Sequence, residues 1–246
     1  MKQGFFTVVS NERIANDVML MKLSGDTSAI TASGQFVNIK IEGLFLRRPI
    51  SVCDYDEGTL TLIYKVVGEG TEVMSGYGAG EVLDVLTGLG NGYDTSLSGE
   101  KPLLIGGGVG VPPLYNLCKK LVAEGKKPTV VLGFNSAGDV FYEDEFRALG
   151  AEVSVTTADG SYGIKGFVTN AMDVEYTHFY CCGPEPMLKA VYAATKTSGQ
   201  LSFEERMGCG FGACMGCSCK TITGYKRICK EGPVMMKEEI LWQTQK

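Results

Sequence analysis

Hydrophobic and polar residues follow a strand-like pattern over the first 98 residues. Short segments rich in β-branched and aromatic residues are separated by turn signals, and several of them alternate apolar with polar positions. None of these segments extends to the 3.6-residue period of a helix. We therefore expect an all-β barrel or sandwich. The predicted strands cover residues 5–9, 18–23, 36–41, 59–67 and 81–86.

A different pattern begins at Lys101. A short buried strand over 102–105 precedes a glycine-rich turn, and the apolar residues that follow the turn have helical spacing. Pro112 begins this helix and Gly125 ends it. Strands that alternate with helical patterns predict a doubly wound parallel α/β domain. The further strands cover residues 129–132, 152–155 and 177–181, within a domain that we expect to run from 99 to 200.

The overall composition is that of a globular protein. Of the 246 residues, 44% are hydrophobic and 21% are charged, which excludes disorder as the main state. The net charge of -5 offers no basic field for nucleic acid. The N-terminal segment lacks the apolar core of a secretory signal, and no stretch has the ~20 apolar residues that span a bilayer. We expect a cytoplasmic protein that binds neither nucleic acid nor membrane.

Cysteine is concentrated in a third predicted domain over residues 201–246, whose charged end we expect to be helical. Four of the nine cysteines lie between Cys209 and Cys219. A cytosolic protein that concentrates thiols in this way more often binds a metal than forms disulfides. The single histidine, His178, excludes a multi-histidine zinc site and leaves one residue for histidine-based acid–base chemistry.

Cys209, Cys214 and Cys217 have the C-x4-C-x2-C spacing that is typical of plant-type [2Fe-2S] clusters. The fourth ligand is Cys229 or Cys219, and we prefer Cys229 because this pattern takes its last thiolate from a distant segment. The alternatives are buried or disulfide-bonded cysteines, or a four-cysteine zinc site, which usually has two C-x2-C pairs where this chain has one. Four glycines give the loop room to turn its N–H groups inward: Gly208, Gly210, Gly212 and Gly216.

Two turns follow buried strands and open helices. Residues Gly106–Gly110 have the context in which a glycine-rich loop cradles a phosphate at a helix N-terminus, and Cys182–Met187 follows the strand at 177–181 in the same way. Each could be an ordinary structural turn. Both, however, would lie at the carboxyl ends of parallel strands, where open α/β sheets bind ligands. Together they predict a nucleotide site at Gly106, Gly107, Gly108, Gly110, Gly183 and Pro184, with Cys182 beside it.

Weaker signals lie in the first domain. Arg48 precedes Pro49 at the start of a strand, where an arginine can clamp a pyrophosphate. The segment Ile63–Lys65 precedes Gly70 and Thr71, small residues that allow close approach to a phosphate or a flavin. Each signal alone is weak, because an exposed arginine usually carries only a surface charge.

The order of these motifs gives a resemblance to the ferredoxin-reductase family over nearly the whole chain. That family combines a flavin barrel carrying Arg-Pro-x-Ser with a nucleotide domain carrying Gly-Gly-x-Gly and Cys-Gly-Pro-x-Pro-Met. The Met-x-Cys-Gly-x-Gly-x-Cys-x-x-Cys segment resembles most closely the electron-transfer subunits of dihydroorotate dehydrogenase B complexes. Relatives commonly carry Arg where Lys65 stands, and Lys lacks the bidentate fork. The resemblance implies FAD contacts by Arg48, Pro49, Ile50, Ser51, Ile63, Tyr64, Lys65, Gly70 and Thr71, and a cluster on Cys209, Cys214, Cys217 and Cys229.

The activity that this resemblance implies is electron transfer in de novo pyrimidine (UMP) biosynthesis. An FMN-containing dihydroorotate dehydrogenase catalytic subunit would supply electrons through the cluster and FAD to NAD⁺, in a heterotetramer of two of each subunit. FAD is needed because NAD exchanges two electrons at once and a [2Fe-2S] cluster exchanges one. Flavin subunits of cytoplasmic hydrogenases and of NAD(P)H:ferredoxin reductases have the same architecture and are the alternative. A redox-sensing or structural metal protein would contain no flavin.

Three finer expectations follow. Residues 133–139 contain no Arg or Lys to pair with a 2′-phosphate, which predicts a preference for NAD over NADP. Cys182 is expected to shape the hydride path beside the nicotinamide rather than to act as a nucleophile. Apolar residues around and after the cluster either form a partner interface or merely cover the cluster. They are Phe211, Met215, Val234, Met235, Met236, Leu241 and Trp242.

Overall fold

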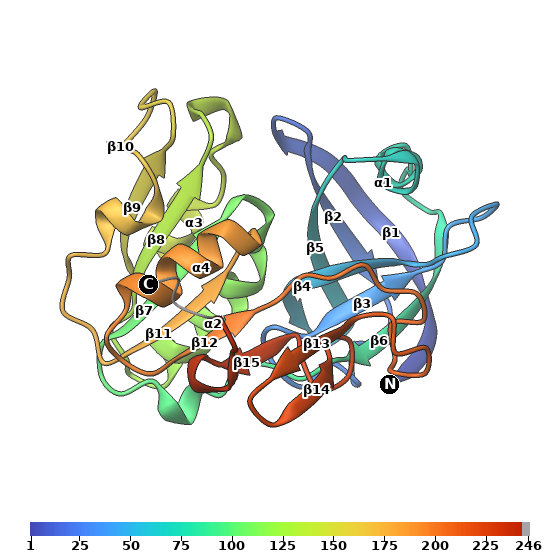
Figure 1. The fold of residues 1–246 in the computed structure, drawn as a ribbon. Coiled ribbons are helices and arrows are strands. Elements are labelled where there is room, and N and C mark those ends of the chain that lie inside the picture. Colours follow the sequence, from blue (N-terminus) through green and yellow to red (C-terminus); the bar gives the residue numbers. More distant parts are fainter. Residues whose placement is uncertain (243–246) are drawn as a thin grey trace.

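In the computed structural model, which describes residues 1–242, the first six strands close into an antiparallel barrel in the order β1-β2-β5-β4-β3-β6 (Figure 1). Alternate residues of each strand point inward, and Leu60, Leu62 and Tyr64 of β5 belong to the barrel core. The predicted β-barrel is therefore confirmed. The strands are β1 (Lys2–Ala15), β2 (Val18–Ser24), β3 (Phe36–Ile39), β4 (Arg48–Asp56), β5 (Thr59–Lys65) and β6 (Val82–Leu89).

The barrel differs from the sequence expectation in three elements. Strand β4 is not among the predicted strands, although a strand start at Arg48 was expected. Strand β1 is much longer than the predicted segment, because register shifts after Val8 and Arg13 let one strand bend along the barrel while it stays paired with β2. A short helix, α1 (Glu69–Ser75), was not predicted. Its first turn is closed by the Thr71 hydroxyl, which accepts a hydrogen bond from the Val67 N–H at 2.9 Å. Gly68 before the helix and Gly70 within it weaken the helical signal in the sequence.

A second sheet has the order β10-β9-β8-β7-β11-β12-β15, and all of its pairs are parallel except β12 with β15. Along β7, Leu104 faces the core that contains α2, whereas Leu103 and Ile105 face the core that contains α4. Helices thus cover both faces, and the predicted doubly wound α/β architecture is confirmed. The strands are β7 (Pro102–Gly107), β8 (Thr129–Phe134), β9 (Glu152–Thr157), β10 (Ile164–Lys165), β11 (His178–Cys182), β12 (Gly199–Ser202) and β15 (Val234–Met236). The helices are α2 (Pro112–Ala123), α3 (Glu143–Ala148) and α4 (Glu185–Ala194), with 3-10 turns η1 (Thr95–Leu97), η2 (Gly108–Gly110), η3 (Ala137–Asp139) and η4 (Val168–Ala171).

Helix α2 packs against barrel strand β4. Asn116 on α2 donates a hydrogen bond to Asp54 at 2.6 Å and accepts one from Ser33 at 2.6 Å. Cys53 and Ile63 of the barrel belong to the same buried core as α2. The barrel and the α/β sheet therefore meet along a packed and hydrogen-bonded surface. His178 is buried at the start of β11 and packs edge-on against Tyr180, as expected for a core histidine.

The C-terminal segment forms a hairpin of β13 (Ser218–Thr221) and β14 (Gly224–Arg227) and then adds β15 to the second sheet. The expected helical end is wrong over residues 237–242, where the structure has only the short 3-10 turn η5 (Lys237–Glu239). Backbone pairing competes with a helix there, because the Ile222 N–H donates to the Glu239 carbonyl at 3.0 Å. Residues 243–246 lie outside the described part. The predicted domain boundaries, at residues 98 and 200, stay a prediction. Within residues 1–242, no helix combines the length and the apolar character needed to cross a membrane.

Candidate functional site

The two predicted nucleotide turns lie directly against each other. Strands β7 and β11 are neighbours, and Gly106 pairs with Cys182. A Cβ atom on Gly110 would overlap the Cys182 carbonyl and would lie 2.6 Å from the Gly183 nitrogen. A side chain at Gly110 has no room, so the chain needs glycine at this contact. The structure thus joins both turns into one edge at the carboxyl ends of parallel strands, where α/β sheets bind nucleotides.

Cys182 lies at that edge, half-buried, with the hydroxyls of Ser202 and Tyr93 within hydrogen-bonding reach. Burial is the main cause that raises the pKa of Cys182 to about 12. The thiol therefore stays protonated at neutral pH and is a poor nucleophile. This property agrees with a positioning role rather than a nucleophilic one.

The first flavin segment surrounds a tight contact between strand β4 and helix α1. The Arg48 guanidinium lies against Gly70, where a Cβ atom would overlap it. Gly70 and Thr71 are buried, and Pro49, Ile50 and Ser51 are half-buried. An arginine held beside the first turn of a helix, with small residues next to it, fits the pyrophosphate of a dinucleotide. Of the residues that the resemblance implies, the structure thus brings Arg48 and Gly70 together.

The second flavin segment, Ile63–Lys65, presents its side chains to different surroundings. Tyr64 points into the barrel core, and its hydroxyl donates a hydrogen bond to Asn11 at 3.0 Å. Ile63 is buried in the core shared with the α/β sheet. Lys65 is half-buried at the end of β5. Any contact with FAD from this segment would use its backbone or the Lys65 side chain.

The cysteines of the C-terminal loop come as two pairs. Cys214 contacts Cys209 through a hydrogen bond from its backbone N–H to the Cys209 sulfur, and Cys229 contacts Cys217 in the same way. Within residues 1–242, no three metal-ligating side chains converge as a single metal ion requires. A [2Fe-2S] cluster needs four thiolates divided over two irons, and two pairs of cysteines fit that requirement.

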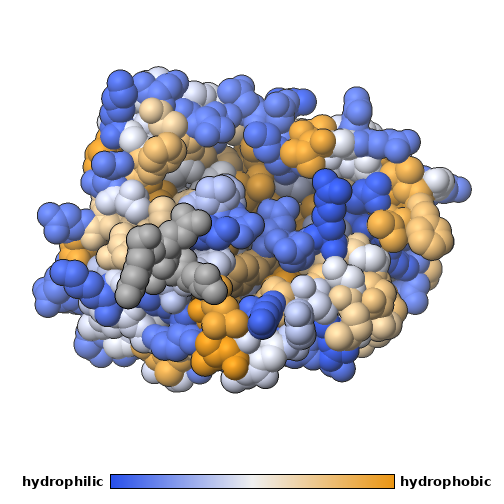
Figure 2. All heavy atoms as spheres, viewed as in Figure 1, coloured by the Kyte–Doolittle hydropathy of each residue, from blue (hydrophilic) through white to orange (hydrophobic). Residues whose placement is uncertain are grey.

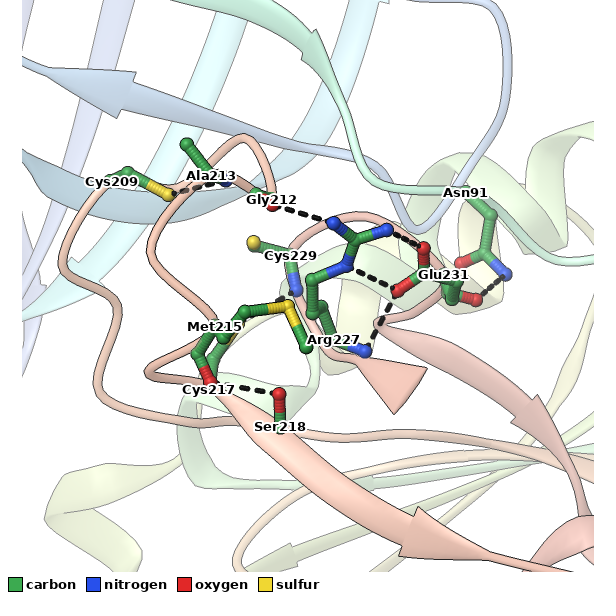
Figure 3. A network of polar contacts seen from close by, with 10 residues as sticks. All are labelled: Asn91, Cys209, Gly212, Ala213, Met215, Cys217, Ser218, Arg227, Cys229 and Glu231. Carbon is green, nitrogen blue, oxygen red and sulfur yellow. Dashed lines mark hydrogen bonds and ion pairs between the residues drawn. The ribbon is translucent and has the colours of Figure 1, made fainter. Parts of the chain in front are cut away.

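Backbone N–H groups point at the sulfurs of these pairs (Figure 3). Those of Ala213 and Cys214 donate to the Cys209 sulfur at 3.2 and 3.4 Å, and that of Cys229 donates to the Cys217 sulfur at 3.4 Å. Burial alone would raise the pKa of Cys209, but these donors and the Cys214 thiol lower it to about 6. Burial and the Cys217 thiol raise the pKa of Cys229 to about 12. Amide donors aimed at sulfur are the environment that a cluster thiolate needs.

Cys219 stands apart from these pairs. It lies on β13 opposite Lys226, is half-buried, and burial raises its pKa. Cys229 reaches Cys217 because the β13–β14 hairpin returns the chain to the cysteine loop. The geometry therefore supports Cys229 as the fourth ligand, although the choice itself stays a prediction.

The cysteine loop also touches the barrel beside the flavin segment. Asn38 on β3 donates a hydrogen bond to the Cys209 carbonyl at 3.4 Å, and a Cβ atom on Gly210 would overlap its amide. In the β3–β4 pairing, Asn38 stands directly opposite Pro49. One strand therefore separates the flavin segment from the loop of cysteines.

A hollow of about 410 Å³ lies between the cysteine loop and the turn that joins β3 to β4. Phe45 on this turn is 100% exposed, Phe211 on the loop is 44% exposed, and Cys209 and Cys214 line the hollow with them. Figure 2 shows apolar atoms in separate patches, one of them over the β3–β4 turn at the right. The sequence analysis missed Phe45 because nothing in a sequence distinguishes an exposed phenylalanine from a core one.

The apolar residues predicted to flank the cluster divide between surface and core. Phe211, Met215 and Leu241 are exposed, as an interface requires. Val234 and Met235 are buried in β15, and Trp242 packs against Tyr192 and Phe203, so these three stabilise the fold instead.

Two family models match the chain. One describes the iron–sulfur cluster binding domain of dihydroorotate dehydrogenase B and matches residues 204–241, and the other describes an oxidoreductase NAD-binding domain and matches residues 104–193. The electron transfer subunit of dihydroorotate dehydrogenase B (NAD(+)) from Bacillus pumilus is 46% identical over 98% of each chain. That from Fusobacterium nucleatum is 45% identical over 95% of this chain and 96% of its own.

Solved structures show the same architecture. The NADH-dependent reduced ferredoxin-NADP oxidoreductase matches with a TM-score of 0.87 and 30% identity, over 96% of this chain and 90% of that one. A cytochrome P450 reductase from Amycolatopsis matches with a TM-score of 0.71 and 24% identity, over 78% of this chain and 65% of that one, which shows the fold alone.

Proposed function

The chain belongs to the family of electron-transfer subunits of dihydroorotate dehydrogenase B, and from this premise we propose that it passes electrons from a dihydroorotate-oxidising subunit through a [2Fe-2S] cluster and FAD to NAD⁺. This step belongs to de novo pyrimidine (UMP) synthesis. The observation that carries the proposal is the contact of the Cys209–Gly210 backbone with Asn38, one strand from Pro49. It brings a cluster loop and a flavin segment together in one chain.

Separate groups of residues in this chain would bind FAD and NAD. Arg48 and Lys65 would hold the FAD phosphates, with Ser51 and Thr71 as further polar contacts. The turn from Gly106 to Gly110 would hold NAD against Gly183 and Pro184, and Cys182 would shape the space beside the nicotinamide. When bound, FAD would exchange single electrons with the cluster and a hydride with NAD.

The partner that we propose is an FMN-containing dihydroorotate dehydrogenase subunit, in a complex of two copies of each chain. We propose that it docks over the hollow lined by Phe45, Phe211, Cys209 and Cys214, because the exposed ligand edge is where electrons can enter. Exposed aromatics are enriched at interface cores. We assign the complex to the cytoplasm, since none of the nine cysteines forms a disulfide, as expected in a reducing compartment.

The alternative, a flavin subunit of a hydrogenase or of an NAD(P)H:ferredoxin reductase, is not favoured. The ferredoxin-NADP oxidoreductase is 30% identical to this chain, whereas the curated electron transfer subunits reach 46% over nearly the full length.

The nucleotide preference is open to direct measurement. Ser136 on the loop after β8 donates a hydrogen bond from its hydroxyl to Asp139 at 2.7 Å, so a carboxylate stands where a 2′-phosphate would come. We expect NADH to be used at least about tenfold better than NADPH, which corresponds to roughly 1.4 kcal/mol. Steady-state rates of dye reduction with both nucleotides test this. NADPH rates equal to or above those with NADH would contradict it.

Reconstitution tests the function itself. The chain alone should reduce artificial acceptors with NADH but should not oxidise dihydroorotate, because that reaction belongs to the FMN-containing subunit. Addition of the FMN-containing subunit should produce NAD-linked dihydroorotate oxidation and co-elution in size exclusion at the mass of two plus two chains. Separate elution without that activity would remove the proposed partner.

A pair of variants locates the docking surface in the same assay. Phe45→Ser should weaken co-elution by about tenfold or more in affinity, as expected for an aromatic anchor. Phe167→Ser removes another exposed phenylalanine, 71% exposed against 100% for Phe45, from the α/β domain and should leave the complex intact. Equal effects of both variants would place the interface elsewhere.

A further inference from the structure

Arg227, which is not a cluster ligand, connects the two segments that carry the four paired cysteines (Figure 3). It is the last residue of β14 and stands two positions before Cys229. Its Nη1 donates a hydrogen bond to the carbonyl of Gly212, in the loop between Cys209 and Cys214, at 2.6 Å. The hairpin that brings Cys229 is thereby fastened to the loop that brings the first pair.

Glu231 fixes the direction of this guanidinium. Its carboxylate accepts hydrogen bonds from Nε of Arg227 at 2.9 Å, from Nη2, and from the Arg227 backbone N–H at 2.8 Å. The guanidinium lowers the pKa of Glu231 to about 2, so both partners are charged. Asn91, just after the barrel, donates to the Glu231 carbonyl at 3.1 Å. The contacts with Glu231 therefore fix the Arg227 side chain and keep its guanidinium at the cysteine loop.

The contact with Gly212 determines where the next N–H group points. A trans peptide is planar, so its carbonyl and its N–H point in opposite directions. In the Gly212–Ala213 peptide, the carbonyl accepts from Arg227 and the N–H donates to the Cys209 sulfur at 3.2 Å. A positive charge on the carbonyl side also polarises the peptide and strengthens the N–H as a donor.

Glycine permits this orientation of the peptide. Gly212 has φ of +90°, a conformation that side chains rarely adopt, and a Cβ atom there would lie 2.6 Å from the Lys230 side chain. The glycine and the arginine thus act on one peptide, from its backbone conformation and from its carbonyl oxygen.

We propose that Arg227 is a positioning residue for the cluster, which sets the Ala213 N–H on the Cys209 sulfur and so raises the reduction potential of the cluster. This inference rests on the proposed function, which supplies the cluster. Hydrogen bonds to the sulfurs and nearby charge are known determinants of such potentials. Both stabilise the more negative, reduced state, so their removal must lower the potential.

The test compares Arg227→Gln with Lys226→Gln in the whole complex, by titration of the cluster potential followed by electron paramagnetic resonance. Lys226 is the preceding residue on β14, has the same charge and nearly the same side-chain exposure, 24% against 23%, and pairs with Glu239 rather than with the cysteine loop. Both variants lose one positive charge. Only Arg227→Gln releases the Gly212 carbonyl.

We expect Arg227→Gln to lower the ratio of reduced to oxidised cluster at a fixed potential by about tenfold, which is about 59 mV for one electron. The FAD content should not change, and Lys226→Gln should keep the wild-type ratio. Arg227→Lys keeps the charge but lacks the planar guanidinium. Its ratio of reduced to oxidised cluster should lie between those of the wild type and Arg227→Gln. Equal ratios for the Gln variants at both positions would overturn the inference.

Two further outcomes remain decisive. If Arg227→Gln retains no cluster, Arg227→Lys is titrated in its place, and a wild-type potential in that variant would overturn the inference. A wild-type complex with FAD but without iron would overturn the proposed function itself, and the inference with it. Iron and FAD per chain separate these cases.

Discussion

Serine at any of the four paired cysteines should remove the cluster and end NAD-linked dihydroorotate oxidation in the complex. Cys217 and Cys229 are 2% exposed each, and the Cys229 backbone N–H donates a hydrogen bond to the Cys217 sulfur. Serine at either position would replace a buried thiolate ligand with a hydroxyl. Loss of an outer-shell partner already costs about 10- to 100-fold in metal affinity, and loss of a ligand should cost more. Iron per chain and activity with dihydroorotate measure this.

The flavin should survive in these variants. Arg48 and Gly70 lie on the barrel, and no cysteine of the loop belongs to that contact. Reduction of an artificial acceptor by NADH should therefore continue at a rate close to wild type. Simultaneous loss of FAD and iron would show instead that the substitution had unfolded the chain.

Cys219→Ser is the matched control for the ligand variants. It changes the same chemical group two residues from Cys217, at a half-buried position opposite Lys226. The cluster and the coupled activity should both remain. If Cys219→Ser lost the iron while Cys229→Ser kept it, Cys219 would be the fourth ligand and the assignment made here would be wrong.

Much of the fold could be predicted because periodicity reports burial on one face. Most strands of the barrel, the strands β7, β8, β9 and β11 of the α/β sheet, and helix α2 with Pro112 at its start follow directly from such patterns. Helix α1 could not be predicted in this way, since Gly68 before it and Gly70 within it weaken the helical signal and Thr71 supplies the compensating hydrogen bonds. The prediction of a helix at the charged C-terminal end was wrong for a related reason. Pairing with Ile222 decides its conformation, and that contact is remote in sequence.

The residues of the candidate site also divide into those that the sequence predicts and those that only the structure reveals. Spacing alone indicated the cysteines and the two glycine-rich turns, because ligand geometry and phosphate binding impose local sequence rules. Arg227 and Phe45 obey no such rule. In the sequence, an arginine in a hairpin cannot be told from any other surface charge. Its role depends on the hydrogen bond to the carbonyl of Gly212, fifteen positions earlier in the chain. Contacts of this kind are created by tertiary structure and can be read only from it.

Alanine at Gly110 should slow the reduction of the bound flavin by NADH. Its Cβ atom would overlap the Cys182 carbonyl and approach the Gly183 nitrogen to 2.6 Å, and backbone atoms cannot rotate away as a side chain can. Overpacking of this kind costs about 1–3 kcal/mol, or roughly five- to 150-fold, as the two turns are forced apart. Stopped-flow reduction by NADH measures the rate, with FAD and iron content expected to stay constant.

Gly125→Ala provides the comparison at the other end of α2. That glycine has φ of +79° with nothing within 4 Å of a Cβ atom, so alanine there meets only the backbone cost of about 1–2 kcal/mol in stability. Its rate of flavin reduction should match the wild type even if the melting temperature falls. Because Gly110→Ala acts by separating the two turns, its effect should appear in NADH reduction and not in the dye-linked oxidation of chemically reduced flavin. A wild-type rate with NADH in Gly110→Ala would mean that the turns can part without loss, and that the nucleotide does not bind between them.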